Sequence, residues 1–72
     1  MKSANVTTEV AGTVWRIVAR KGAPLMVGDV ILIMESMKME IPIEAPRAGK
    51  LAEILVVEGD VLKEDDAVAI VE

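Results

Sequence analysis

Hydrophobic residues of this chain cluster in short segments of five to seven residues, and the segments are separated by glycine, proline or aspartate. Valine, isoleucine and leucine dominate them, and such residues favour strands because they pack well on a pleated surface. No stretch has the length and the single apolar face of an amphipathic helix. The pattern predicts an all-β fold with four clear strands and two weaker ones, at 13–19, 30–35, 51–57, 67–71, 4–10 and 39–45.

Apolar side chains occupy both alternating faces of these strands, most clearly in 13–19. A strand at the surface of an open sheet would alternate apolar and polar residues instead. A small closed or flattened barrel fits this pattern better, since closure removes the sheet edges. Pro42 and Pro46 have no backbone N–H, so we expect the segment 39–45 at a sheet edge or a bulge.

The two halves of the chain repeat each other. Ala11-Gly12 falls on Ala48-Gly49 at an offset of 37 residues, and this register continues without a gap to Glu35 on Glu72. Eight aligned pairs are identical: Ala11/Ala48, Gly12/Gly49, Ile17/Ile54, Gly22/Gly59, Leu25/Leu62, Asp29/Asp66, Ile33/Ile70 and Glu35/Glu72. Two similar strand sets that cannot each bury an apolar face should pack against one another. We therefore expect a single domain, 1–72, with a pseudo-two-fold axis relating halves at about 4–35 and 39–72, joined by a hairpin at 35–40.

Composition narrows the functional classes. The 72 residues include no cysteine and no histidine, which removes disulfides, thiolate metal sites and the commonest general base. Ser3 and Ser36 are the serines of the chain, and neither has a histidine to activate it. The acidic run 64–66 lacks the spacing of a calcium loop and is expected to be a solvated turn. We expect no catalytic residue and no metal site.

Charge and hydropathy limit the partners and the location. Residues 1–35 carry four basic and three acidic side chains, and residues 36–72 carry four basic and nine acidic ones, for a net charge of −4. This balance argues against a nucleic-acid partner. The apolar run 31–34 is far below the ~20 residues that span a membrane, and no secretory signal follows Met1. A cytoplasmic protein without membrane association is the default expectation.

Lys38 lies in the segment that joins the two halves, Glu-Ser-Met-Lys-Met-Glu at 35–40. Strands on both sides predict a tight hairpin with Met37 and Lys38 in its turn. Such turns require positive φ, where methionine and lysine each cost about 1 kcal/mol. A local rule broken at an exposed tip indicates function, so Lys38 is interpreted as a site of modification. In the alternative interpretation, Lys38 is an ordinary surface lysine, and Met34, Met37 and Met39 fill the core.

Further motifs accompany this segment: Gly22 with Gly28-Asp29, Ala45-Pro46 with Gly49, and Gly59-Asp60-Val61. Together with the segment 35–40, they resemble the biotinyl/lipoyl carrier-domain family, most closely its biotinyl branch, the biotin carboxyl carriers. The resemblance extends from about Val6 to Glu72, and Ser36 replaces the alanine that many members carry. The turns 22–29 and 59–66 have equal lengths, so the chain lacks the protruding thumb loop of some biotin carriers.

The resemblance implies a flattened β-barrel of two four-stranded sheets, a barrel-sandwich hybrid, with the target lysine at a hairpin tip. It implies covalent biotin on Lys38, attached by a biotin protein ligase. A biotin carboxylase would load carboxyl groups onto the biotin, and a carboxyltransferase would pass them to an acceptor such as an acyl-CoA, as in fatty acid biosynthesis. The chain itself would be a non-catalytic carrier.

The same resemblance assigns ligase recognition to the neighbours of the lysine. Met37 and Met39 would offer flexible, polarizable contacts. Ser36, Glu35 and Glu40 would complete the recognised segment. For the two glutamates, cross-strand and solvation roles are equally compatible with the sequence.

Three alternatives stay open. A lipoyl carrier shares the implied fold but usually has Asp-Lys-Ala at the tip, whereas Met37 and Met39 flank Lys38 here. Some small members of the family accept both biotin and lipoate, and Ser36 is compatible with this dual use. A third alternative is an unmodified barrel that serves in assembly. The chain is either a free-standing carrier or a domain of a larger carboxylase.

Overall fold

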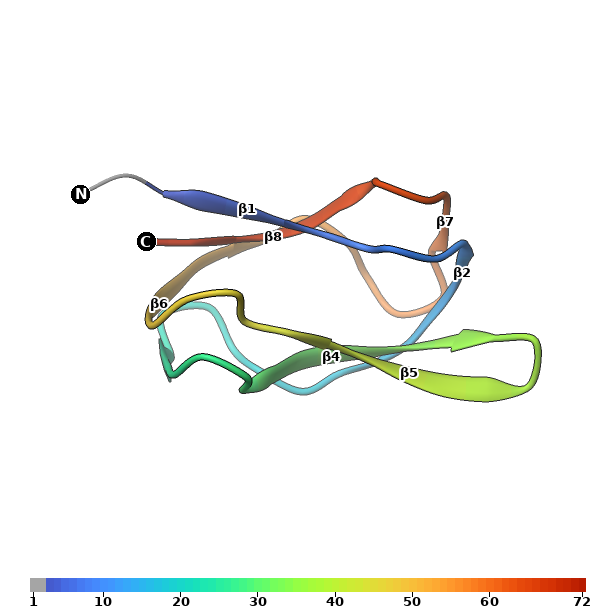
Figure 1. Ribbon diagram of the computed structural model, residues 1–72, viewed down its shortest axis with the longest axis horizontal. Helices are drawn as coiled ribbons and strands as arrows, with labels where there is room; N and C mark the ends of the chain where they lie inside the picture. Colours follow the sequence, from blue (N-terminus) through green and yellow to red (C-terminus); the bar gives the residue numbers. More distant parts are fainter. Residues whose placement is uncertain (1–2) are drawn as a thin grey trace.

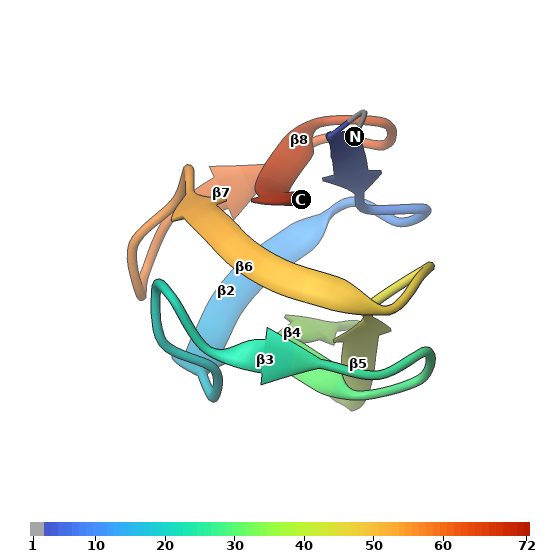
Figure 2. The same cartoon turned by 90° about the vertical axis from the view of Figure 1, so that its left-hand side faces the viewer.

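The computed structural model describes residues 3–72 and contains eight strands in two four-stranded antiparallel sheets. The strands are β1 (Ala4–Thr7), β2 (Gly12–Ile17), β3 (Pro24–Leu25), β4 (Val30–Ser36), β5 (Met39–Glu44), β6 (Gly49–Ile54), β7 (Val61–Leu62) and β8 (Ala67–Val71). One sheet has the order β1-β8-β6-β3 and the other the order β5-β4-β2-β7. Figures 1 and 2 show them packed as a flattened barrel, which confirms the predicted fold class. Within residues 3–72, no helix is long and apolar enough to cross a membrane.

Each of the six predicted segments contains a strand, but three strands end earlier than predicted. β1 stops at Thr7, β2 at Ile17 and β6 at Ile54, because in each case the chain crosses to the other sheet for its next strand. The pattern did not predict β3 and β7, which have two residues each and are too short to show alternation. Pro42 lies in β5, an edge strand as predicted.

Irregular pairing explains why apolar residues occupy both faces of the strands. The pairing of β4 with β5 skips Ile31, and the pairing of β8 with β1 skips Val68. An extra residue of this kind is a β-bulge. Ile31 and the following Leu32 are both fully buried, as are Val68 and the following Ala69. Each bulge therefore turns two consecutive side chains into the core.

Main-chain hydrogen bonds of the two halves correspond under the offset of 37 residues. Clear examples are Thr8 N to Asp66 O (3.0 Å) with Ala45 N to Asp29 O (2.8 Å), and Gly22 N to Leu51 O (2.7 Å) with Gly59 N to Val14 O (2.8 Å). All four bonds join one half of the chain to the other. The resulting body measures 36 × 18 × 18 Å, with the β4–β5 hairpin at one end and the start of β1 and the end of β8 at the other (Figure 1).

Gly12 and Gly49 begin β2 and β6, where a neighbouring strand approaches too closely for a side chain. A Cβ atom on Gly12 would lie 2.6 Å from the carbonyl oxygen of Glu35. A Cβ atom on Gly49 would collide with the carbonyl oxygen of Glu72, the corresponding atom in the other half. Neither glycine has a positive φ, so close approach, and not turn conformation, requires glycine here.

The turn between β4 and β5 consists of Met37 and Lys38, with φ angles of 52° and 65°. A two-residue hairpin turn of this kind needs positive φ at both positions. For residues other than glycine, asparagine and aspartate, this conformation costs roughly 1–2 kcal/mol each. The predicted conflict between the residues and the turn geometry is confirmed.

Valine at position 12 or 49 is expected to lower the free energy of unfolding by about 1–3 kcal/mol, because the adjoining strand must shift to admit the side chain. Thermal unfolding of Gly12→Val and Gly49→Val, followed by circular dichroism, measures this loss. Ala11→Val changes an exposed neighbour and serves as the control with an unchanged midpoint. Wild-type midpoints for both glycine variants would refute the close-approach explanation.

Asparagine at position 37 is expected to raise the free energy of unfolding by about 0.5–1 kcal/mol, since it adopts positive φ with less strain than methionine. Urea denaturation of Met37→Asn measures this gain. Met39→Asn removes an exposed methionine from a strand, where asparagine is disfavoured, so it should not stabilise. A Met37→Asn midpoint at or below that of the wild type would show that the turn is unstrained.

Candidate functional site

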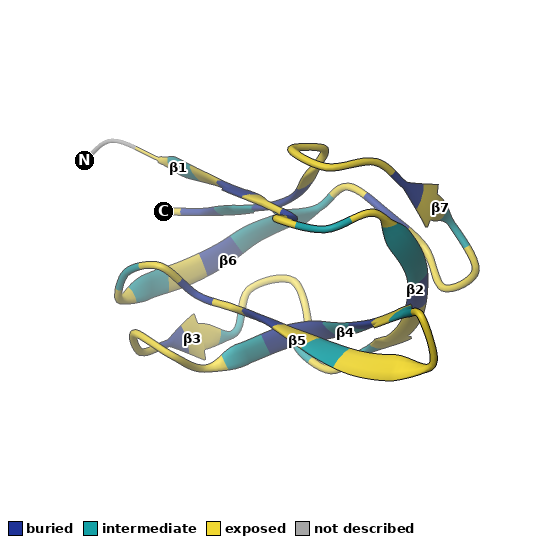
Figure 3. Ribbon diagram, turned by 45° about the vertical axis from the view of Figure 1, so that its right-hand side comes forward, coloured by how far each residue is buried: buried dark blue, intermediate teal, exposed yellow. Residues whose placement is uncertain are grey.

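The β4–β5 hairpin extends past the core, and its tip is exposed (Figure 3). Met34 is fully buried, whereas Met37 is 92% exposed and Met39 is 64% exposed. The interpretation in which all three methionines fill the core is therefore wrong for Met37 and Met39 and right for Met34. Two large, mostly exposed apolar side chains thus flank Lys38, as at surfaces that contact partners.

Lys38 occupies the second position of the turn and is exposed. Its amine makes no ion pair or hydrogen bond with residues 3–72. The ion pair found among these residues joins Lys21 Nζ to Glu53 Oε2 at 3.2 Å. Strands β4 and β5 remain paired up to Ser36 and Met39. The arrangement thus presents a primary amine to solvent on a firmly paired base, which is what covalent attachment of a large group requires.

Glu35 and Glu40 face each other across the hairpin, one step below its last pair. Both are exposed, and like charges placed directly opposite destabilise a sheet by roughly 0.2–1 kcal/mol. No ion pair within residues 3–72 offsets this repulsion. The two glutamates are therefore a cross-strand pair, but their interaction does not stabilise the hairpin.

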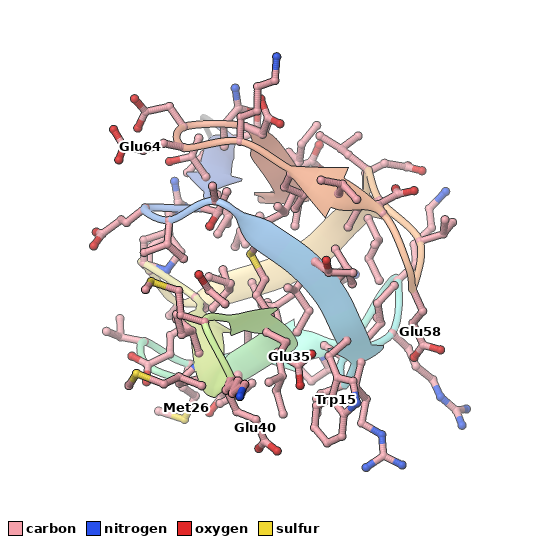
Figure 4. All side chains as sticks on the ribbon, turned by 90° about the vertical axis from the view of Figure 1, so that its right-hand side faces the viewer. Trp15, Met26, Glu35, Glu40, Glu58 and Glu64 are labelled. Atoms are coloured by element: carbon pink, nitrogen blue, oxygen red, sulfur yellow. The ribbon has the colours of Figure 1, made fainter. Side chains whose placement is uncertain are left out.

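Trp15 is a residue of this region that the sequence analysis did not select. It occupies the extra position of a bulge where β2 pairs with β4, and it is 46% exposed. The Arg16 guanidinium carbon lies 5.9 Å from the centre of its ring. Figure 4 shows Trp15, Glu35 and Glu40 on the same side of the molecule. The repeat aligns Trp15, the one aromatic residue, with Ala52, and this mismatch is the signal that could have identified it.

A groove of about 480 Å³ lies between β5 and the segment that follows β1. The charged residues that line it are Glu9 and Glu44, and the rest of the lining is apolar or uncharged. It contains no amine that could accept an acyl group. The hairpin tip, and not this groove, is therefore the candidate site, and it brings together all the residues that the sequence predicted: Glu35, Ser36, Met37, Lys38, Met39 and Glu40.

Comparison with known proteins agrees with this geometry. The family model described as "Biotin-requiring enzyme" matches residues 1–71. The "Biotin/lipoyl attachment protein" of Bacillus subtilis (strain 168) is 41% identical over 61 residues, covering 85% of this chain and 84% of that protein. The "Biotinylated protein TB7.3 homolog" of Mycobacterium leprae (strain TN) is 37% identical over 67 residues, covering 93% and 94%.

A solved structure extends the likeness to three dimensions. The crystal structure of the Kluyveromyces lactis urea carboxylase matches 100% of this chain with a TM-score of 0.95 and 32% sequence identity, and the match covers 6% of that protein. The same fold thus occurs as a small part of a urea carboxylase chain, and similar sequences make up most of two short proteins. The chain belongs to the biotinyl branch of the biotinyl/lipoyl carrier-domain family and is a carrier domain, not a catalytic one.

Proposed function

We propose that biotin is attached to Lys38 and that the chain carries carboxyl groups between the active sites of a biotin-dependent carboxylase. The observation that carries this proposal is an exposed lysine in a strained turn, between two exposed methionines. Strain at a surface tip brings no gain in packing, so a functional reason for these residues is favoured. Membership of a biotin-requiring family supports biotin as the attached group.

The chain supplies the amine for attachment, and a biotin protein ligase supplies the activation. The Lys38 ammonium must lose a proton before its nitrogen can attack the activated carboxyl of biotin. An amide C–N bond then forms as the bond to the activating group breaks. No residue within 3–72 forms a hydrogen bond with the Lys38 amine that would take this proton, so a group of the ligase takes it. We propose that Glu35, Ser36, Met37, Met39 and Glu40 form the surface that this ligase recognises.

Once bound, biotin supplies the ring nitrogen that accepts and releases the carboxyl group. The chain supplies reach and a high effective concentration, on the order of millimolar for a short tether. Met37 and Met39 can adapt to more than one partner because their side chains are flexible and polarizable. We propose a biotin carboxylase and a carboxyltransferase as these partners, with an acyl-CoA as the first acceptor to test.

Lipoate on the same lysine is the second candidate. The name of the Bacillus subtilis relative includes both groups, and lipoate forms the same kind of amide with a lysine. Either group needs only the exposed amine that Lys38 presents. The methionines on both sides of Lys38 favour biotin, since the lipoyl branch usually has aspartate and alanine there.

Incubation with a biotin protein ligase, biotin and ATP is expected to raise the intact mass of the chain by one biotinoyl group. Lys38→Arg keeps the positive charge and should gain nothing, while the other lysines act as internal controls. If the mass of the wild type does not rise, lipoate becomes the proposed group on Lys38, and incubation with a lipoate ligase tests it. Failure of both ligases would overturn the proposal of a modified lysine.

Met39→Ala is expected to lower the kcat/KM of biotinylation about tenfold, which corresponds to a loss of ~1.4 kcal/mol of contact with the ligase. The thermal midpoint should stay at the wild-type value because Met39 is 64% exposed. Met26→Ala is the matched control, since Met26 is 70% exposed and lies outside the hairpin. An unchanged rate for Met39→Ala would remove Met39 from the recognised surface.

A further inference from the structure

We propose that the outer face of the β5-β4-β2-β7 sheet, centred on Trp15, is a resting platform for the biotin ring carried by Lys38. The inference rests on the proposed biotinylation of Lys38. The platform consists of Trp15 and Arg16 of β2 with Glu35 of β4 and Glu40 of β5. All four residues are exposed, and Figure 4 shows the three labelled ones grouped on one side.

The internal repeat provides a comparison within the molecule. The pairing of β6 with β8 skips Ala52 just as the pairing of β2 with β4 skips Trp15. The two bulges are equivalent, so the backbone offers the same outward position in both sheets. The sheet that carries the lysine has an indole there, and the sheet that carries the termini has a methyl group. The indole is therefore no requirement of the fold at this position.

The position of Trp15 suits the length of a biotinylated lysine. Arg16, Ile33 and Pro42 lie in one row across β2, β4 and β5, and Trp15 lies next to this row toward the hairpin tip. At the usual strand dimensions, Trp15 is about 10–13 Å along the strands from Lys38 and about 5–10 Å across them. About eleven bonds join the lysine Cα atom to the biotin ring, and they extend to roughly 14 Å. The ring can thus reach the indole when the arm folds back along the hairpin.

The chemistry of the platform matches that of the ring. The fused rings of biotin have an apolar face, which suits contact with an indole that is 46% exposed. The ureido group of biotin has two N–H donors and one carbonyl acceptor. Glu35 and Glu40 can accept hydrogen bonds at one border of the platform, and Arg16, whose guanidinium lies over one face of the indole ring, can donate them. Glu35 and Glu40 have no ion pair within residues 3–72, so their oxygens are available.

Trp15 is the one aromatic residue of the chain, so its fluorescence reports on the platform alone. Biotinylation, verified by intact mass, should shift the Trp15 emission to shorter wavelength. It should also lower the constant for acrylamide quenching of Trp15 by about twofold, because a tethered ring that covers the indole about half of the time halves its accessibility. The matched control is the double variant Trp15→Ala/Ala52→Trp, which moves the reporter to the equivalent bulge of the other sheet. Its emission should not respond to biotinylation.

A second measurement does not depend on any ligase. Biotinamide, the untethered amide of biotin, is titrated into the unmodified protein while the emission of Trp15 is followed. We expect a response that saturates in the millimolar range for the wild type and none for the double variant. A flat wild-type titration, or equal responses of both proteins to biotinylation, would overturn the platform. Failure of the ligase to modify Lys38 would instead overturn the proposed function, so the two failures are distinguishable.

Discussion

The structure depends on the interleaving of the two halves of the chain. Each sheet takes two strands from the first half and two from the second, so neither half can form a sheet of its own. Hydrogen bonds such as Thr8 N to Asp66 O and Ala45 N to Asp29 O close this exchange at equivalent places. The interleaved frame buries one common core, in which Ile31, Leu32 and Val68 are fully inaccessible. The core that 72 residues can form supplies only a small free energy of unfolding. The fold therefore depends on the hydrogen bonds and the packing that join the two halves.

That frame makes an unfavourable hairpin possible. The tip of the β4–β5 hairpin combines positive φ at Met37 and Lys38, two exposed methionines and the opposed carboxylates of Glu35 and Glu40. The strained turn and the opposed carboxylates lower the stability of the folded chain, and the exposed methionines add little burial to offset this. Together they lie at one end of the molecule, beyond the last buried residue of β4, so the core does not have to adapt to them. A carrier needs this division, because its tip must fit other proteins while its barrel remains unchanged.

The pseudo-two-fold symmetry separates architecture from function. Features present in both halves, such as the equivalent bulges and the tight approaches at Gly12 and Gly49, serve the barrel. Features present in one half alone need another reason. Trp15 against Ala52 is such a difference, and Trp15 belongs to the sheet that carries the lysine. The repeat therefore acts as an internal control for assigning residues to function.

Local signals in the sequence determined the positions of six of the eight strands, the turn at Met37 and Lys38, the candidate lysine and the repeat. Those signals depend on neighbours along the chain or on the offset of 37 residues, so no partner strand was needed to detect them. Other features depend on residues distant in the sequence. The bulges at Ile31 and Val68 exist only in relation to a partner strand, and the two-residue strands β3 and β7 acquire their pairing from β6 and β2. Gly12 has an ordinary φ and needs to be glycine because the Glu35 carbonyl, from another strand, approaches it. Trp15 joined the candidate site for the same reason: its place beside the hairpin is set by strand pairing, which the tertiary structure alone decided.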